Sequence, residues 1–485
     1  MSTQMHSIVG AIVVALMVTG CASTGGLSTQ ATPTDANGLA ASRSLADANV
    51  SPAAWPHDDW WTTFGDPQLD QLMSEALAGS PTLKVAAARA RKALALADVS
   101  KSALYPQVNA DLEVTRERFS ERGLVPAPFA GNWATQNQLQ ATLGWELDLW
   151  GKNRSAYESA LGTAKAAAVD AYAARLALST SIAQAYVQLQ RAYLQLDVAQ
   201  QTLAERERTY ALTRDRTAAG IDSRLELKQA ESALPAAREQ IEQLQEAIAL
   251  TRNQLAALLG QGPDRGLTLA RPDAHSLAVV ALPANVPAEL VGRRPDLIAG
   301  RARVEAAQKD IAVAKAEFYP NVNLIAFVGL QSLGSSGFLS AASRMMGVGP
   351  AVSLPIFNGG RLRANLAGKD ADYDIAVEQY NQTVADALRD VVDQLASFKS
   401  LSEQRRQQAQ ALATAQEAYD LALLRYREGI GNYLQVLSVE QPLLVQQSLD
   451  ADLRSRELAL SISLIRALGG GYDEPKPAVA AANPQ

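Results

Sequence analysis

The chain has 485 residues, of which 48% are hydrophobic and 19% are charged, and its formal net charge at pH 7 is −6. This balance excludes a disordered chain, because disorder requires low hydrophobicity and high net charge. It also argues against nucleic acid as a partner, because phosphate binding needs a concentrated Lys/Arg surface and the sequence has no basic cluster.

The chain begins with a segment typical of a signal peptide. An apolar run from Ile8 to Val18 would span only about 17 Å as a helix, against a bilayer core of ~30 Å. The run ends at Thr19, Gly20 and Cys21, and small residues before a lone cysteine resemble the bacterial lipobox, in which the cysteine thiol carries lipid. We therefore predict lipidation at Cys21. The alternative is cleavage after a small residue, which would leave a free cysteine.

Beyond the N-terminal segment the chain is duplicated. The dipeptide Tyr-Pro at 105–106 recurs at 319–320, and Gly-Ile at 220–221 recurs at 429–430, with offsets of 214 and 209 residues. The expected organisation is a signal peptide (1–20), a lipidated flexible tether (21–55), a first repeat (56–262), a linker (263–287), a second repeat (288–471) and a disordered tail (472–485).

Each repeat contains two segments that alternate apolar and polar residues, the pattern of a two-faced strand. Leu139, Leu143 and Leu147, for example, alternate with Gln138 and Gln140. The predicted strands are about 107–118, 136–148, 321–331 and 347–357. In the last strand the apolar side is assigned to Val348, Val352, Leu354 and Ile356.

These strands are about ten residues long, which suffices to cross a bilayer at a tilt. A sheet in lipid must close without edges, and the smallest spanning barrels have eight strands. Four strands therefore need further chains. Two chains would give eight strands and three would give twelve, and the residues alone leave both open.

Two helices of unusual length are expected in the repeats. No proline interrupts residues 152–218, about 67 residues or roughly 100 Å of helix. Ile182, Leu189 and Leu196 recur every seven residues, which predicts antiparallel coiled-coil packing. The surface is otherwise rich in Ala, Gln, Ser and Thr, which fits a polar stripe along a water-filled channel. The predicted helices are 152–218 and 222–259 in the first repeat, and 361–428 and 432–468 in the second.

With these features placed, the chain resembles the outer-membrane efflux proteins of the TolC/OprM superfamily, in their NodT-type lipoprotein branch. The motifs are DWWTTFGDPQLD at 59–70, LVGRRPDL at 290–297, LPIFNGGR at 354–361 and RYREGIGNYL at 425–434. The resemblance implies a mainly α fold with a small β part, assembled as a homotrimer with a twelve-stranded β-barrel and an α-helical barrel. It further implies an outer-membrane exit duct fed by a periplasmic adaptor protein and an inner-membrane pump, often of the RND type.

The resemblance also implies a gate near the hairpin tips. The family's gate carboxylate falls on Glu226 and its gate tyrosine on Tyr426. Three copies of Glu226 near one axis would repel and raise their pKa unless basic neighbours compensate. The inner-facing carboxylates of the second tip fall on Gln435 and Ser438, so that acidic ring is absent here. The candidate gate residues are Glu226, Arg224, Arg425 and Tyr426.

The reversals between helices are expected at two glycines that need a left-handed backbone. These tips are the expected contact with the adaptor. The tip residues are Gly220, Ile221, Gly429 and Ile430.

Other functions are less well supported by the sequence. An enzyme is improbable, because no catalytic motif or Cys/His cluster is present and the three histidines, His6, His57 and His275, are far apart. No cofactor is expected. A periplasmic coiled-coil adaptor would not explain the strands or the duplication. A duct for protein or oligosaccharide export of the type I kind remains an alternative.

Overall fold

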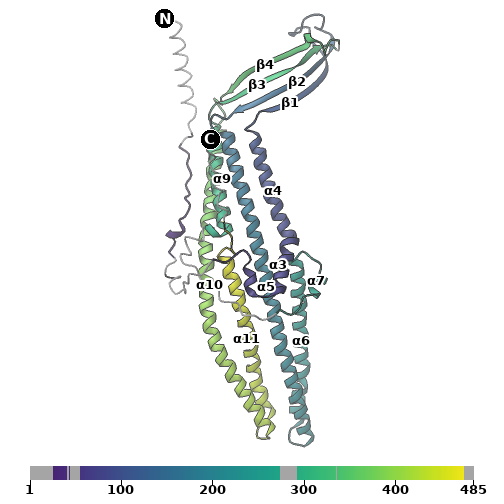
Figure 1. The fold of residues 1–485 in the computed structure, drawn as a ribbon, viewed down its shortest axis with the longest axis vertical. Coiled ribbons are helices and arrows are strands. Elements are labelled where there is room, and N and C mark those ends of the chain that lie inside the picture. The colour runs from purple at the N-terminus through teal and green to yellow at the C-terminus, as the bar shows by residue number, and fades with distance from the viewer. Residues whose placement is uncertain are drawn as a thin grey trace, which may run out of the picture. The chain divides into compact units, whose positions relative to one another are not determined.

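The computed structural model of the protein describes residues 24, 26–40, 43, 55–272, 292–334 and 336–473. The predicted signal peptide, Cys21, part of the linker and most of the tail lie outside the described residues. The chain divides into two compact units (Figure 1). Unit 1 comprises 1–33, 89–168 and 299–381, and unit 2 comprises 34–88, 169–298 and 382–485.

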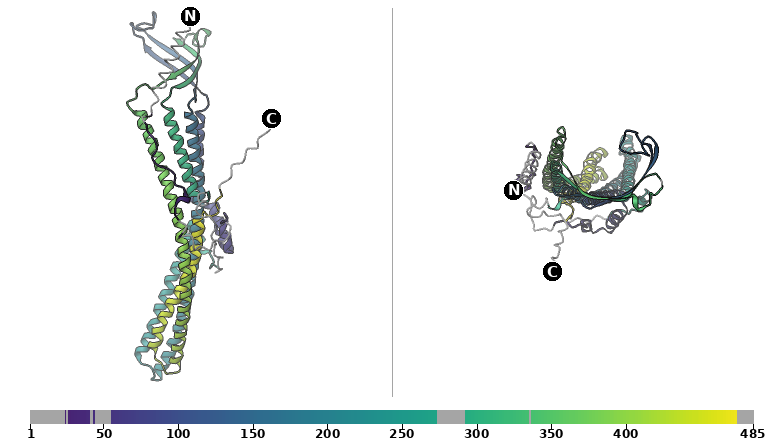
Figure 2. Two further views of the ribbon diagram at one scale, coloured as in Figure 1. Left: turned by 90° about the vertical axis from the view of Figure 1, so that its left-hand side faces the viewer. Right: turned by 90° about the horizontal axis from the view of Figure 1, so that it is seen from above.

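Unit 1 contains one four-stranded antiparallel sheet in the order β1-β2-β3-β4 (Figures 1 and 2). Its register places Val108 opposite Leu143, Leu143 opposite Ala326, and Ala326 opposite Val348. The apolar sides of all four strands therefore form one continuous face, as the alternation predicts. The strands are β1 (Gln107–Arg118), β2 (Trp133–Leu147), β3 (Asn321–Leu333) and β4 (Arg344–Ser353).

The last strand differs from the expected range. It begins at Arg344 and ends at Ser353, so Leu354 and Ile356 lie outside it, and the Ile356 side chain is 83% exposed. The chain turns here toward the helix that begins at Arg361, through Gly359 and Gly360 in left-handed conformations. The second strand begins at Trp133, three residues earlier than expected.

The helices occur in pairs of equal length in the two halves of the chain. The pairs have 22, 67 and 35 residues, and the 67-residue helices each span roughly 100 Å. The pairs are α4 (Pro81–Ser102) and α9 (Pro295–Ala316), α5 (Lys152–Ala218) and α10 (Arg361–Arg427), and α6 (Arg224–Leu258) and α11 (Tyr433–Ala467). Two short helices, α3 (Pro67–Gly79) and α7 (Asp264–Leu267), occur only in the first half of the described chain. Among the described residues, no helix has both the length and the apolar composition needed to cross a bilayer.

The heptad positions of α5 form the core of unit 2. Ile182 and Leu189 are fully buried, and Leu196 is buried in the same cluster. The cluster also contains Leu69 and Leu72 from α3. In both views of the ribbon, α6 runs beside α5 and α11 beside α10 (Figures 1 and 2). The predicted coiled-coil pairing is thus present as two helical hairpins.

Some described residues of the N-terminal segment contact other residues of unit 1. The backbone amides of Gln30 and Ala31 donate hydrogen bonds to the Asp374 carboxylate in α10, at 3.0 and 2.9 Å. Leu27 packs beside the cluster that contains Phe318. These described residues therefore have contacts that the composition of the segment does not reveal, and the flexible tether at 21–55 stays a prediction.

Candidate gate at the tips of the helical hairpins

Glycines end the long helices at both hairpin tips. Gly220 and Gly429 have φ values of +74° and +77°. The Ile221 amide donates to the carbonyl of Arg216 at 2.9 Å, and the Ile430 amide donates to that of Arg425 at 3.0 Å. This is the six-residue hydrogen bond of a Schellman motif, which requires a left-handed residue where the helix stops. The two turns are therefore built alike, as the duplication predicts.

The two tips present the same apolar side chains to solvent. Ile221 and Leu225 in the first hairpin are 62% and 65% exposed, and Ile430 and Leu434 in the second are 68% and 59% exposed. Each residue of the second pair lies 209 residues after its counterpart. Exposed apolar groups that gather at one place commonly mark a protein interaction site.

Tyr426 joins the two hairpins just inside the tips. Its side chain is fully buried, with 0% exposure. The phenol donates a hydrogen bond to Asp222 Oδ2 at 2.6 Å, and its oxygen lies 2.7 Å from the hydroxyl of Thr213 in α5. A residue of α10 is thus fixed to the turn and the last helical turns of the first hairpin.

Arg216 completes this group of side chains, which we call the tip pin (Thr213, Arg216, Asp222 and Tyr426). Its guanidinium donates two hydrogen bonds to Asp222, at 2.9 and 3.2 Å, and one to the backbone carbonyl of Tyr426, at 2.9 Å. The guanidinium carbon also lies 4.5 Å from the centre of the Tyr426 ring, within range of a cation–π interaction. The ion pair is largely buried, since its side chains are 10% and 7% exposed.

Burial and charge set the protonation states in the tip pin. Burial, reinforced by the hydrogen bond to the Asp222 carboxylate, raises the pKa of Tyr426 to about 12. Burial alone would raise the pKa of Asp222, but hydrogen bonds from Arg216 and Tyr426 outweigh it and hold that pKa below 3.8. At neutral pH the tyrosine is therefore a neutral donor and the aspartate a charged acceptor, the stronger kind of hydrogen bond.

The other predicted gate residues are placed differently. Glu226 accepts hydrogen bonds from the Ser223 amide, at 2.9 Å, and from its hydroxyl, and so forms the capping box at the start of α6. These bonds lower the pKa of Glu226 within the single chain, in contrast to the rise expected for three repelling copies. Arg224 is exposed, and Arg425 donates to the Ile430 carbonyl at 3.4 Å. In the described chain neither arginine is paired with Glu226.

Sequence reasoning identified Tyr426 but missed its partners. Asp222 stands four residues before the predicted Glu226, and Arg216 lies within the repeated Arg-to-Ile turn sequence. One signal in the sequence could have indicated the ion pair. Arg216 and Asp222 lie on either side of Gly220, and a tight turn at Gly220 brings these two positions together. The role of Thr213 could not be found this way, because its partner lies in the other hairpin.

A second polar contact links the hairpins farther from the tips. Arg206 in α5 donates to Glu440 in α11 at 2.9 Å and to the carbonyl of Ala233 in α6 at 3.2 Å. The Arg206 and Glu440 side chains are 11% and 8% exposed. Removing one partner of such a buried pair leaves an uncompensated charge, so the pair fixes how α11 lies on α5.

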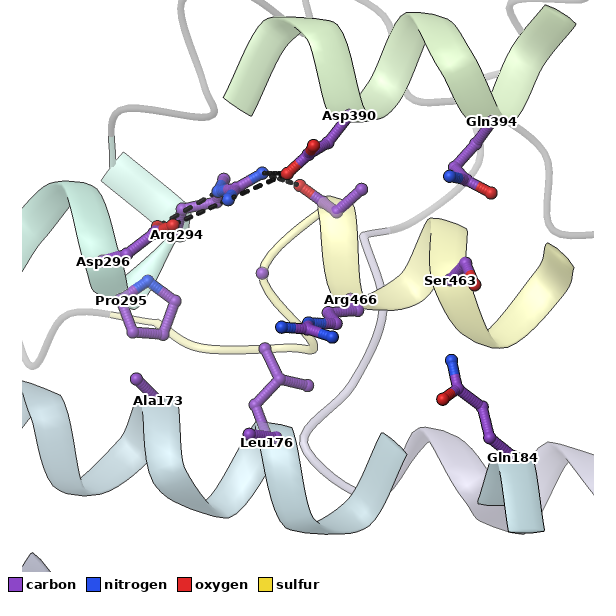
Figure 3. A pocket seen from close by; sticks show the side chains of 13 residues that line it. Ala173, Leu176, Gln184, Arg294, Pro295, Asp296, Asp390, Gln394, Ser463 and Arg466 are labelled. Carbon is purple, nitrogen blue, oxygen red and sulfur yellow. Dashed lines mark hydrogen bonds and ion pairs between the residues drawn. The ribbon is translucent and has the colours of Figure 1, made fainter. Parts of the chain in front are cut away.

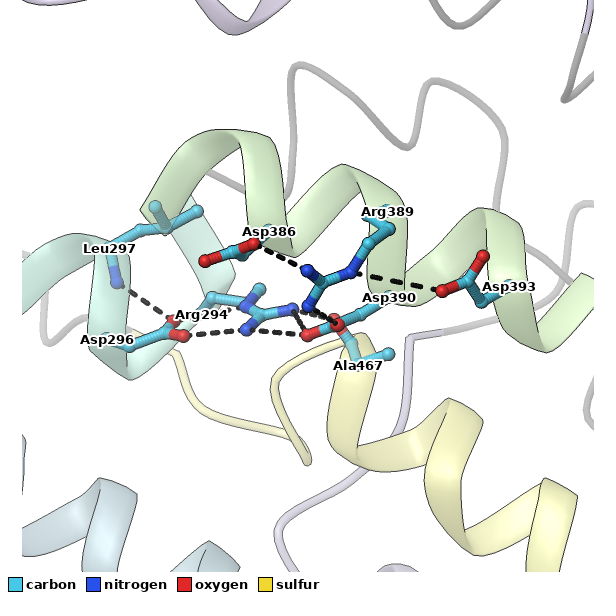
Figure 4. A network of polar contacts seen from close by, with 8 residues as sticks. All are labelled: Arg294, Asp296, Leu297, Asp386, Arg389, Asp390, Asp393 and Ala467. Carbon is cyan, nitrogen blue, oxygen red and sulfur yellow. Dashed lines mark hydrogen bonds and ion pairs between the residues drawn. The ribbon is translucent and has the colours of Figure 1, made fainter. Parts of the chain in front are cut away.

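A third charged group lies where α11 ends (Figure 4). Arg294 donates to both carboxylate oxygens of Asp296, at 3.1 and 2.6 Å, to Asp390 in α10 at 3.4 Å, and to the Ala467 carbonyl at 3.2 Å. Burial would lower the pKa of Arg294, but the two aspartates outweigh this and raise it. This arginine, from the RRPD sequence, therefore anchors both helices of the second hairpin to the start of α9.

A cavity of about 540 Å³ adjoins Arg294 between α5, α10 and α11 (Figure 3). Its lining includes Gln184, Gln394, Ser463 and Arg466. The side-chain carbonyl of Gln394 is buried without a hydrogen-bond partner. Within the described residues there is no group of three or more His, Cys, Asp or Glu side chains that could hold a metal ion.

The profile of a known protein family, described as "Outer membrane efflux protein", matches residues 72–261 and 286–470 of the chain. Fusaric acid resistance protein FusA of Burkholderia cepacia is 43% identical over 364 residues, which are 74% of this chain and 68% of FusA. Multidrug resistance outer membrane protein MdtP of Escherichia coli strain K12 is 33% identical over 435 residues, covering 88% of this chain and 89% of MdtP.

Solved structures agree with the sequence comparisons. The outer membrane protein VceC from Vibrio cholerae superposes with a TM-score of 0.81 at 36% identity, covering 86% of this chain and 100% of VceC. The outer-membrane channel OprN gives a TM-score of 0.83 at 29% identity, covering 93% of this chain and 99% of that one.

Proposed function

The chain belongs to the outer membrane efflux protein family, and from that premise we propose that three copies of it form the exit duct of a tripartite efflux system. The protein is an outer-membrane efflux component that extends into the periplasm. Relatives are named for resistance to fusaric acid, for multidrug resistance and for toluene efflux. We therefore propose small toxic organic molecules as its cargo, conducted passively.

One observation carries the proposal that several chains build one barrel, namely that the sheet is two-faced and open at both sides. Within the described residues, β1 pairs only with β2 and β4 only with β3. Each edge strand presents unpaired backbone groups beside an apolar face, on which Val108, Leu112 and Val348 are 67%, 67% and 78% exposed. In lipid these groups must be paired, and pairing β1 of one chain with β4 of the next would close a barrel. The number of chains follows from the family resemblance, which implies three chains and therefore twelve strands.

The tip pin is our proposed gate lock. It holds Tyr426 of the second hairpin against Asp222 and Arg216 of the first, so the hairpins cannot separate while it is intact. We propose that Glu226 contributes mainly by capping α6, and that Arg224 and Arg425 stay in solvent until partner chains are present. The four exposed apolar tip residues are our proposed contact with the periplasmic adaptor, which links the duct to an inner-membrane pump of the RND type.

The experiment that tests the proposed function combines fractionation with complementation. The full-length protein should migrate as a heat-modifiable trimer from the outer-membrane fraction, and deletion of its gene should raise susceptibility to small organic toxicants. Recovery as a soluble periplasmic monomer would refute the duct. A deletion strain that loses secretion of a protein or polysaccharide, with unchanged toxicant susceptibility, would point to the other export class.

A further inference from the structure

Five exposed cations lie close to the end of the sheet where its strands join the helices. They are Lys101 in α4, Arg154 in α5, Lys315 in α9, and Arg361 and Arg363 in α10, and we call them the junction cations. None of them forms an ion pair with a carboxylate of the described chain. The neighbouring Lys152 and Lys369, by contrast, are paired with Glu146 at 2.5 Å and Asp372 at 3.2 Å.

Helix electrostatics do not explain these positions. The N-terminal end of a helix favours negative side chains, and α3, α6 and α9 each carry an acidic residue in the first turn, namely Asp70, Glu226 and Asp296. The two helices that start at the sheet, α5 and α10, have none, as is also true of α4 and α11. Arg154 and Arg361 lie in the first turns of α5 and α10, where the helix dipole does not favour a cation.

An aromatic residue accompanies the cations at every junction between a strand and a helix. Tyr105, Trp150, Tyr319 and Phe357 are 57%, 47%, 36% and 91% exposed. Two of them are fixed to each other, since the Trp150 and Tyr319 rings stack at 4.8 Å and the Trp150 indole donates to the Pro320 carbonyl at 2.7 Å. Tryptophan and tyrosine prefer the interface between hydrocarbon and water.

The spacing between aromatic residue and cation is the same at all four junctions. Each pair is four residues apart, with the cation inside the helix and the aromatic residue in the connection between helix and strand. The pairs are Tyr105 with Lys101, Trp150 with Arg154, Tyr319 with Lys315, and Phe357 with Arg361. Along the chain, the apolar strand face, the aromatic ring and the cation therefore follow one another in the same order as the hydrocarbon core, the interface and the phosphate layer of a bilayer.

Three carboxylates lie near these cations and keep their negative charge, but each has another partner in the chain, and the five junction cations outnumber them. Glu146 is paired with Lys152, Asp148 accepts the backbone amides of Asn153 and Arg154, and Glu317 accepts a hydrogen bond from Asn365 at 3.2 Å. The chain as a whole is negative, with a net charge of −6. A positive zone at the base of the sheet is thus a local feature of the fold.

We propose that the junction cations bind the phosphate groups of anionic phospholipids in the periplasmic leaflet of the outer membrane. The proposal rests on the proposed function, because it takes the sheet to lie in that membrane. Basic residues beside a bilayer attract anionic headgroups, and each contributes separately near the surface. A band with one or two cations per junction, repeated in each copy of the chain, would hold the sheet at a fixed depth.

The test measures the melting temperature of the purified full-length protein in detergent with phosphatidylglycerol or phosphatidylcholine. Wild type should melt at least about 3 °C higher with the anionic lipid. The variant K101Q/R361Q/R363Q should lose most of that difference. The control K84Q/R89Q/K92Q removes the same charge from exposed positions of α4 away from the junction, and it should keep the difference.

Each other outcome overturns the inference. If the variant K101Q/R361Q/R363Q keeps the lipid-dependent difference in melting temperature, or if the control loses it equally, the junction cations do not bind the anionic lipid. An equal shift with soluble glycerol phosphate assigns the site to free phosphate instead of lipid. If the variant does not fold, native mass spectrometry of the wild-type protein is the test. Preferential retention of phosphatidylglycerol supports the proposal, and equal retention of phosphatidylglycerol and phosphatidylcholine refutes it. A wild-type protein found outside the outer membrane refutes the proposed function separately.

Discussion

Tyr426 shows how a single side chain can hold two helical hairpins together. Its hydroxyl reaches Asp222, its carbonyl accepts from Arg216, and its ring lies under the same guanidinium. Charge-assisted bonds of this kind contribute about 1.5–3 kcal/mol each. Because they lie in a buried site, solvent does not screen them as it screens surface pairs.

Tyr426→Phe removes the hydroxyl and keeps the ring. The loss of about 1.5–3 kcal/mol should shift the balance between closed and open tips by roughly 10- to 100-fold. In single-channel recordings in planar bilayers, the open probability should therefore rise. Tyr419→Phe is the matched control, because Tyr419 is also buried and no hydrogen bond of its hydroxyl is found in the described chain. Equal behaviour of the two variants would remove Tyr426 from the lock.

The tip pin should also respond to acid. The pKa of Asp222 is lowered from 3.8, so its contribution to the closed state is fully present above pH 3.8 and is lost as the pH falls through the lower folded value. The pKa of Tyr426 is raised from 10 to about 12, so its contribution persists below pH 10 and is lost only as pH rises toward 12. Conductance should be flat between these limits and rise below pH 3.8. Acid opening that persists unchanged in Asp222→Asn would contradict this assignment.

Among the elements, the helical hairpins repeat one design. The long helices stop at glycines in left-handed conformation, and the shorter helices restart at side-chain caps on Ser223 and Asn432. Between its ends the second hairpin is held by Glu440 to Arg206 and by Asp390 to Arg294. The first of these ion pairs is buried and the second is partly exposed, and together they fix the lateral position of the second hairpin.

Gly429→Ala should distort the second tip. Its φ of +77° is a conformation that costs a residue with a side chain roughly 1–2 kcal/mol. Drug resistance that depends on adaptor docking should therefore fall in a strain carrying this variant. Gly368→Ala is the matched control, since Gly368 lies within α10 with open space around it and alanine favours helix there. Full resistance with Gly429→Ala would show that the tip tolerates the strain.

For the whole molecule, we propose two separable attachments to the membrane, the sheet and a lipid anchor. The sheet needs further chains to close, whereas the anchor would be added at Cys21 of each chain. The described residues Gln30 and Ala31 are hydrogen-bonded to Asp374 of α10. Gln30 is the ninth residue after Cys21, so a lipid on Cys21 would lie within about 30 Å of that contact.

Cys21→Ala tests the anchor. The mature wild-type protein should be heavier than its polypeptide by a diacylglyceryl group and an acyl chain, and the variant should lack this mass. The trimer should persist in the variant, because its strands and helices do not include Cys21. A wild-type mass equal to that of the bare polypeptide would remove the lipid anchor and leave the duct unaffected.

The sequence by itself determined the repeated order of helices and strands, because duplication, period-two alternation and heptads are local patterns. It located Gly220 and Gly429, since each belongs to a turn that can be read along the chain, whereas Tyr426 was indicated by the family resemblance. Only the tertiary structure decided which residues Tyr426 meets, because Thr213 and Asp222 lie more than 200 residues away in sequence. It also decided that Gln30 and Ala31 contact Asp374 of α10, because these positions are more than 340 residues apart in sequence and no local pattern links them.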